Sequence, residues 1–229
     1  MAKSVTVISI GGSILVPASG FDPAFLKKFF ALIRNAAKQG QRFVLIIGGG
    51  ATARVYQQAA RATTILTPQD SDWIGIHSTI LNAQWVRIML KDIAYPELIT
   101  VGKKVSTRAP VLVTGGDKPG ATSDLPAVKL AKLYGAKEVL NLSNIACVYT
   151  KDPRKHADAQ PIKIITWPEF RRTIVGTKYE PGMSAPFDPV ASRWAEQQGL
   201  TVKVLDGRDL TEVKRALQGK PIKGTTIHP

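Results

Sequence analysis

The sequence predicts an α/β protein whose central sheet is mostly parallel and covered by helices on both faces. Short β-rich runs alternate with segments of helical periodicity along the whole chain, which is the pattern of a layered α/β fold. The run 43–47 is entirely apolar, as expected of a strand buried on both faces of a parallel sheet. Three strands run directly into glycines and then into a helix. In such sheets, ligands bind beyond the carboxyl ends of the strands.

The first strand is expected at 4–10, followed at once by Gly11-Gly12-Ser13. Asp22-Pro23 then predicts a helix start, with aspartate as the N-cap and proline at the first helical position. Apolar residues on one face continue this helix until Gly40, which marks its end.

The second strand, 42–47, ends in Gly48-Gly49-Gly50, and 51–56 continues in helical register. Arg54 lies about one turn into that helix, where its guanidinium suits a phosphate over the glycine loop. The alternative is a solvated surface arginine. A dinucleotide-binding fold is not indicated, because its glycine fingerprint with a downstream acid is missing.

A long helix is predicted over 74–93, and Asp70 and Asp72 precede it. Two interpretations stay open: one of these residues caps the helix, or Asp72 accepts hydrogen bonds from ligand hydroxyls. The chain has three histidines and one cysteine, so no metal-ligand cluster is expected. Residues 102–108 form a basic connector to the next strand.

The stretch 111–124 is the centre of the predicted site. Its strand ends in Gly115-Gly116, the chain turns through Pro119-Gly120, and Ala121-Thr-Ser-Asp124 opens a helix over 125–134. Glycines let backbone N–H groups approach a ligand closely, and a helix N-terminus favours phosphate. The Thr/Ser/Asp cluster that ends at Asp124 also supplies hydroxyl and carboxylate oxygens that can cap this helix.

A further strand at 137–142 leads into the loop 143–152, where Tyr149 suits a nucleotide base and Lys151 its phosphates. Asp152-Pro153 on its own is only a turn signal. The remaining elements are predicted as a strand at 162–165, a short helix from Trp167, a loop over 176–187, a helix from Asp188-Pro189 to Gln198, a strand at 201–205, a helix at 209–217 and a strand at 223–227.

The composition is that of an ordinary globular protein with a strong positive charge. Apolar residues make up 44% and the formal net charge is +14. The excess is spread along the chain, which favours anionic ligands over nucleic acid as partners. The single cysteine, Cys147, suits a reducing compartment. No run reaches the ~18 apolar residues of a membrane span, and no signal-peptide pattern begins the chain, so a cytoplasmic location is expected.

Six motifs occur in order along the chain and together resemble a known family. They are Ile10-Gly-Gly-Ser13, Ile47-Gly-Gly-Gly50 with Ala53-Arg54, Asp72-Trp-Ile-Gly75 with Asn82-Ala83, Gly115-Gly-Asp-Lys-Pro-Gly120 with Thr122-Ser-Asp124, Val148-Tyr-Thr-Lys-Asp-Pro153, and Gly224-Thr-Thr-Ile227. The set resembles the uridylate (UMP) kinases of the amino acid kinase superfamily, closest to the archaeal-type form. The resemblance covers essentially the whole chain.

The resemblance implies a three-layer αβα sandwich of the amino acid kinase or carbamate kinase type. It implies a single domain over 1–229, with an acceptor-nucleotide lobe at about 1–135 and an ATP lobe at about 136–229. It further implies transfer of the ATP γ-phosphate to UMP with Mg²⁺, a role in pyrimidine nucleotide synthesis, and a homohexamer.

The resemblance also assigns residues, position by position. UMP would bind Gly49, Asp72, Asp117, Lys118, Pro119, Gly120, Ala121, Thr122 and Ser123. ATP would bind Gly12, Ser13, Gly50, Arg54, Ser143, Tyr149 and Asp152. The catalytic set would be Asp124 as organiser and Lys151 at the transferred phosphate, with Gly12 and Ser13; no dedicated metal ligand is assigned.

The chain departs from the family pattern at several of these motifs. Ile80 and Ala121 stand where the family often has arginine and histidine, which bears on the choice of UMP as acceptor. Ala146 and Cys147 replace an aspartate and a glycine, which bears on the fit of the donor nucleotide. Many superfamily members also have a lysine just before the first glycine pair, where this chain has Ser9 and Ile10. A sister kinase for another small acid or phosphate and a non-catalytic nucleotide-binding or storage homologue remain as alternatives.

Overall fold

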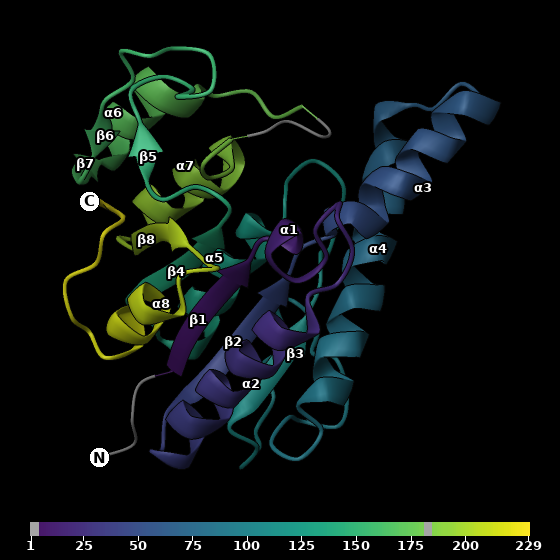
Figure 1. The fold of residues 1–229 in the computed structure, drawn as a ribbon, viewed down its shortest axis with the longest axis vertical. Helices are drawn as coiled ribbons and strands as arrows, with labels where there is room; N and C mark the ends of the chain where they lie inside the picture. The colour runs from purple at the N-terminus through teal and green to yellow at the C-terminus, as the bar shows by residue number, and fades with distance from the viewer. Residues whose placement is uncertain (1–4, 181–184) are drawn as a thin grey trace.

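The computed structural model describes residues 5–180 and 185–229, and it confirms the mostly parallel sheet (Figure 1). Within these residues the main sheet has seven strands. In spatial order they are β3 (Val111–Thr114), β2 (Arg42–Ile47), β1 (Val5–Ile10), β4 (Glu138–Ser143), β8 (Thr201–Asp206), β9 (Thr225–His228) and β7 (Ile164–Thr166). Within the described part of this sheet, only β8 and β9 pair antiparallel; the other neighbouring strands are parallel.

Helices cover both faces of this sheet, as the three-layer αβα prediction requires. Side chains alternate along each strand, so that Ile8 of β1 joins one hydrophobic core and Val7 joins the other. The first core is covered by α2 (Pro23–Lys38), α4 (Pro68–Met89) and α8 (Leu210–Leu217). The second is covered by α5 (Asp124–Tyr134), α6 (Trp167–Phe170) and α7 (Pro189–Gln197). The fold class is therefore confirmed.

Two predicted Asp-Pro helix starts are confirmed at the level of single hydrogen bonds. The Asp22 side chain accepts from the Phe25 amide at 3.0 Å at the start of α2. Asp188 accepts from the Ala191 amide at 2.8 Å at the start of α7. Beyond α2, Gly40 has φ 82°, a left-handed conformation that glycine adopts without strain.

The start of α4 differs from the prediction. Thr67 is its N-cap: the Thr67 hydroxyl accepts from the Asp70 amide at 3.1 Å, and the Asp70 carboxylate accepts from the Thr67 amide at 3.2 Å. This reciprocal capping box satisfies two helix-end donors at once. Asp70 therefore does help to cap the helix, as the N3 partner of the N-cap residue Thr67. Asp72 takes no part in the cap, and its side chain is free for other contacts.

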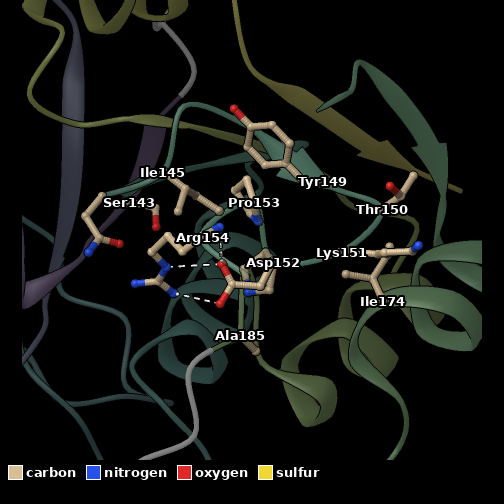
Figure 2. A pocket seen from close by; sticks show the side chains of 12 residues that line it. Ser143, Ile145, Tyr149, Thr150, Lys151, Asp152, Pro153, Arg154, Ile174 and Ala185 are labelled. Carbon is tan, nitrogen blue, oxygen red and sulfur yellow. Dashed lines mark hydrogen bonds and ion pairs between the residues drawn. The ribbon is translucent and has the colours of Figure 1, made fainter. Parts of the chain in front are cut away.

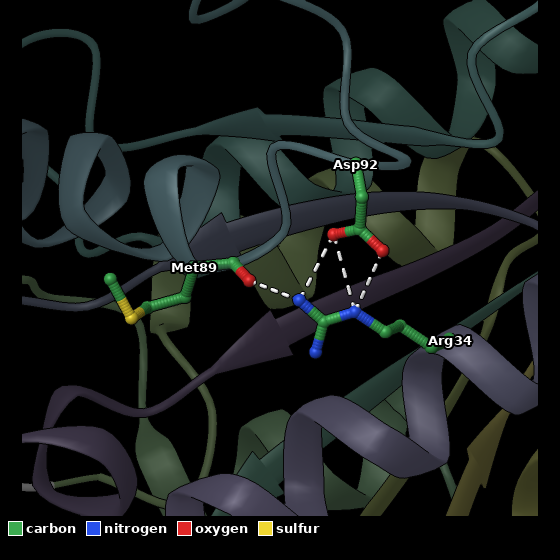
Figure 3. Close-up of polar contacts among 3 residues, drawn as sticks. All are labelled: Arg34, Met89 and Asp92. Carbon is green, nitrogen blue, oxygen red and sulfur yellow. Dashed lines mark hydrogen bonds and ion pairs between the residues drawn. The ribbon is translucent and has the colours of Figure 1, made fainter.

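The end of α4 also differs, because the helix ends at Met89 instead of continuing to residue 93. Arg34 of α2 donates to the Met89 carbonyl and forms an ion pair with Asp92, with 2.9 Å between Nε and Oδ2 (Figure 3). The last turn of a helix leaves carbonyl groups without intrahelical donors. Arg34 supplies one of these donors and ties the end of α4 to α2.

The single strand predicted at 162–165 is wrong, because the chain changes sheet at Lys163. β6 (Pro161–Ile162) pairs with β5 (Val148–Tyr149) in a separate antiparallel ribbon, whereas β7 pairs with β9 in the main sheet. After α6, a short π-helix, η1 (Arg171–Val175), leads to Gly176. Of the loop predicted over 176–187, residues 181–184 lie outside the described residues.

Candidate active site

The three predicted glycine corners lie together at the carboxyl edge of the sheet. β1, β2 and β3 are neighbours, and each ends at this edge in glycines. A one-turn helix, α1 (Gly12–Leu15), follows the first corner, and α3 (Gly50–Thr63) follows the second. On the other side of β1, β4 ends with Ser143.

The first two glycine corners are locked together backbone to backbone. A Cβ on Gly12 would lie 1.9 Å from the Gly50 amide nitrogen, and one on Gly50 would lie 2.5 Å from the Gly12 carbonyl oxygen. Gly50 also has φ 59°. These glycines are thus required by the packing of the two loops as well as by any ligand.

Helix α4 holds the third corner, the loop after β3. The Thr79 hydroxyl accepts from the Gly116 amide at 2.6 Å, and Asp72 Oδ2 accepts from the Gly120 amide at 2.8 Å. Asp72 thus contacts the loop with which it is predicted to bind the acceptor. Within the described part of the chain, the amides of Asp117 and Lys118 donate to no protein group, and they are available to an anion.

Asp72 has a second partner, Tyr179, that the sequence did not indicate. The Tyr179 hydroxyl donates to Asp72 Oδ1 at 2.8 Å. Burial raises the pKa of Tyr179 well above its usual value, and the hydrogen bond and charge of Asp72 add to the rise. The phenol therefore stays protonated, and it remains a donor to Asp72.

Asp124 lies between β1, α7 and the central loop, the segment 115–123 that follows β3. Its Oδ1 accepts from the Ser9 hydroxyl at 2.9 Å, and its Oδ2 accepts from the Asp188 amide at 3.1 Å. The N-cap position of α5 is Ser123, and Asp124 is the first helical residue. The interpretation of Asp124 as the helix cap is therefore wrong.

Asp188 is a second carboxylate beside Asp124, and sequence reasoning identified it only as a helix cap. Its Oδ1 caps α7, while Oδ2 accepts from the Thr122 amide at 2.8 Å. Asp188 is 1% exposed. One buried side chain therefore fixes the start of α7 and the end of the central loop.

This arrangement disfavours the charged form of Asp124. Burial raises the pKa of the Asp124 carboxyl to about 6; the negative charge of Asp188 adds to the rise, and hydrogen bonds from Ser9, the Asp188 amide and Thr122 oppose it. A carboxyl whose pKa is raised by burial and by a neighbouring charge is a candidate functional group. No lysine or arginine forms an ion pair with Asp124 among the described residues.

A cavity of about 270 Å³ opens at the end of β4 (Figure 2). In the strand order, β4 lies on the opposite side of β1 from β2 and β3. The walls of the cavity come from the end of β4, the ribbon strand β5, the loop that follows it, and the segment before α7. Four residues predicted at the donor site, Ser143, Tyr149, Lys151 and Asp152, line it together. A nucleotide has both an apolar base and charged phosphates, so a site for it needs polar and apolar side chains. The lining of this cavity includes the apolar Ile145 beside these polar residues.

Two ion pairs order the charged residues of this cavity. Asp152 binds Arg154, with 3.1 Å between Oδ1 and Nε, and this hydrogen bond lowers the pKa of Asp152. Lys151 binds Asp158 at 2.7 Å, and its side chain points away from the Asp152–Arg154 pair in Figure 2. Arg154 also lines the cavity, and sequence reasoning had not singled it out.

The remaining predicted residues lie around this edge with fewer contacts. Arg54 and Lys118 are exposed, and no ion pair of either is found in the ranges 5–180 and 185–229. Asn82 donates to the carbonyl oxygens of Gly48 and Gly49 at 3.0 and 2.9 Å, so it supports the second corner. Ile80 is 37% exposed, and Cys147 is buried.

No group of three or more His, Cys, Asp or Glu side chains that could hold a metal is found among the described residues. Mg²⁺ in phosphoryl-transfer sites is commonly held by one or two carboxylates together with the phosphates. Asp124 and Asp188 are two neighbouring carboxylates of this kind, but all four of their oxygens already accept a hydrogen bond from the protein.

Comparison with known proteins gives a consistent result. The model of the amino acid kinase family matches residues 4–206. A uridylate kinase of Methanocorpusculum labreanum is 34% identical over 224 residues, covering 96% of this chain and 94% of its own. A uridylate kinase of Pyrococcus abyssi is 30% identical, covering 97% and 99%.

Solved structures agree with the sequence relatives. The crystal structure of uridylate kinase from Archaeoglobus fulgidus superimposes with a TM-score of 0.80 at 26% identity, covering 98% of this chain and all of that one. The UMP kinase structure from Bacillus anthracis gives a TM-score of 0.76 at 19% identity, which supports the fold alone.

Proposed function

The chain belongs to the amino acid kinase family, and from that premise we propose that it transfers the γ-phosphate of ATP to UMP. The observation that carries the proposal is the position of two sites at one edge of the sheet. The loop after β3, which Asp72 holds at Gly120, lies on one side of the glycine corners of β1 and β2, and the cavity lined by Ser143 to Arg154 lies at the end of β4 on the other side. A donor and an acceptor phosphate would meet between them, over Gly12 and Asp124. The relatives named uridylate kinase support UMP as the acceptor.

Each lobe would bind one nucleotide in this mechanism. The lobe at about 1–135 would hold UMP through Gly49, Asp72 and the loop from Asp117 to Ser123. The lobe at about 136–229 would hold ATP through Ser143, Tyr149 and Asp152, with Gly12, Ser13, Gly50 and Arg54 at its phosphates.

Phosphoryl transfer requires mainly positioning and charge neutralisation, and this set of residues supplies both. Backbone amides of the glycine corners would face the phosphates, Asp124 would order the cations around them, and Lys151 would approach the transferred group. Mg²⁺ bound to the phosphates would supply further positive charge. The product UDP places the enzyme in pyrimidine nucleotide synthesis.

The first test is an acceptor panel with ATP and Mg²⁺. We expect UMP to be phosphorylated in preference to CMP and AMP. We also expect Asp72→Ala to raise the KM for UMP and leave the KM for ATP unchanged, because unpaired ligand donors cost ~1–3 kcal/mol. Asp70→Ala is the matched control: it removes the capping box of the same helix but no predicted ligand contact, so the KM for UMP should not change. Faster turnover of CMP or AMP would show a sister kinase instead.

The second test uses the pH dependence of turnover. If ionised Asp124 is required, kcat falls as the pH drops through about 6, the pKa of this carboxyl. Asp188→Asn removes the neighbouring negative charge, so the pKa of Asp124 falls and this acid limb moves to lower pH. The readout is the position of the limb, since the variant can also lower the maximal rate.

Asp22→Asn is the control for helix capping, because Asp22 caps α2 through the same Asp-Pro arrangement and contacts no predicted site residue. Its acid limb should coincide with that of the wild type. An unmoved acid limb in a folded Asp188→Asn enzyme would assign the limb to a group other than Asp124.

We further propose that copies of the chain associate, because the resemblance to the uridylate kinases implies a homohexamer. Two observations support a covered surface on α3 and α4. No residue of α3 is buried, and the exposed side chains of Tyr56, Trp73 and Leu81 line an apolar pocket of about 340 Å³ between the two helices. Contiguous apolar surface of this kind is typical of protein contacts. Light scattering measures the number of copies directly.

The location proposed for this enzyme is the cytoplasm, where its nucleotide substrates occur. Among the residues that the structure describes, no helix is both long enough and apolar enough to cross a membrane.

A further inference from the structure

We propose that Tyr179 is a positioning residue of the acceptor site, and that its hydroxyl fixes the Asp72 carboxylate to bind a vicinal diol. The inference rests on the proposed function, because it takes the acceptor to be a ribonucleotide. It goes beyond the motifs, since Tyr179 belongs to none of them.

The geometry starts from the two oxygens of Asp72. Oδ1 accepts from the Tyr179 hydroxyl and Oδ2 accepts from the Gly120 amide, both at 2.8 Å. Two donors on two different oxygens fix both the position of the carboxylate and its rotation about the Cβ–Cγ bond. With only one of them the group could still turn.

The remaining capacity of the carboxylate suggests what it binds. An ionised carboxylate offers about four lone-pair sites, and Tyr179 and Gly120 occupy two of them. One site then remains on each oxygen. Two neighbouring hydroxyl groups of a ribose can donate to both, whereas a deoxyribose has only one of these donors. A fixed carboxylate therefore distinguishes ribose from deoxyribose better than a mobile one.

The electrostatics keep Tyr179 in this role. Burial and the charge of Asp72 both oppose ionisation of the phenol, so the hydroxyl is a donor throughout the working pH range. The contact joins residues 107 positions apart in the chain, from the proposed ATP half to the proposed acceptor half. Tyr179 is partly buried, so a water molecule cannot freely take the place of its hydroxyl as the donor to Asp72.

The test compares Tyr179→Phe with the wild type, varying UMP or its 2′-deoxy form at saturating ATP, and varying ATP at saturating UMP. The substitution removes only the hydroxyl. We expect the KM for UMP to rise about tenfold, with kcat and the KM for ATP unchanged. The preference for UMP over deoxy-UMP in kcat/KM should fall by a similar factor. In an Asp72→Asn background, Tyr179→Phe should add little, because both variants disturb the same carboxylate.

Tyr134→Phe is the matched control, since the Tyr134 hydroxyl also makes one long-range contact, accepting from the Val105 amide at 3.0 Å. It borders none of the predicted ligand residues, and its kinetics should equal those of the wild type. An unchanged KM and sugar preference in Tyr179→Phe would overturn the proposal. A lower KM for UMP would also overturn it, because Tyr179 would then compete with the acceptor.

The proposed function is tested separately, by measuring whether the wild-type enzyme forms UDP from UMP and ATP. If it phosphorylates a different ribonucleotide, UMP is wrong as the acceptor, and the same comparison is made with that nucleotide and its deoxy form. An unchanged sugar preference in Tyr179→Phe overturns the Tyr179 proposal in that case too.

Discussion

Replacing Asp124 with asparagine is expected to abolish most of the turnover while the protein remains folded. The substitution keeps the size of the side chain and removes its charge. If Asp124 orders the cations around the phosphates, kcat should fall by about a hundredfold or more, which corresponds to ~2.7 kcal/mol. The KM for either nucleotide should change far less, because charge that acts in the transition state affects kcat more than binding.

The stability of this variant gives an independent check. Asp124 has a pKa of about 6 in the folded protein, raised from 3.8, so its ionised form opposes folding. This penalty is fully present above pH 6, diminishes as the pH falls through 6, and is absent below about 4. Asp124→Asn removes it at the expense of one hydrogen bond, worth ~0.5–1.5 kcal/mol.

We therefore expect the melting temperature of Asp124→Asn to equal or exceed that of the wild type at pH 8, with the variant losing this advantage towards pH 5. Circular dichroism melts at the two pH values measure this. A variant that melts far below the wild type at pH 8 would indicate a structural role, and full activity in a folded variant would exclude the organiser role.

The elements of the fold that could be predicted are those fixed by local sequence. Residues 42–47 form β2 as predicted, because an apolar run bounded by a glycine cluster has few other structures in an α/β chain. Asp22-Pro23 and Asp188-Pro189 likewise fix their helix starts within a few residues. The start of α4 was predicted too late because the capping box of Thr67 and Asp70, with Pro68 at the first helical position, was not recognised as the helix start.

The site was predictable where it consists of loops that follow strands, and less so where it depends on tertiary contacts. The glycine corners meet because β1, β2 and β3 are adjacent, and a parallel sheet brings their carboxyl ends to one edge. Tyr179 and the second role of Asp188 could not be found this way. They reach Asp72 and Asp124 across 107 and 64 positions of the chain, and nothing in the local sequence specifies either contact.

The second large effect is expected at Lys151. This chain has Ser9 and Ile10 where many superfamily members have a lysine before the first glycine pair, and Ser9 instead donates to Asp124. The cation at the transferred phosphate must then come from elsewhere, and Lys151 lines the donor cavity. We expect Lys151→Met to lower kcat by roughly a hundredfold or more, about 2.7 kcal/mol, with little change in UMP affinity.

The ion pair between Lys151 and Asp158 is compatible with that role. The side chains are 50% and 68% exposed, and exposed ion pairs contribute only ~0–1 kcal/mol, so ATP phosphates can readily replace Asp158 as the partner of Lys151. Asp158→Asn should therefore keep or raise the turnover. Lys155→Met, four residues further along the same exposed segment, is the matched control for loss of one positive charge and should retain wild-type kcat. A Lys151→Met enzyme within threefold of the wild type at saturating ATP and Mg²⁺ would transfer the role to Lys118 of the central loop.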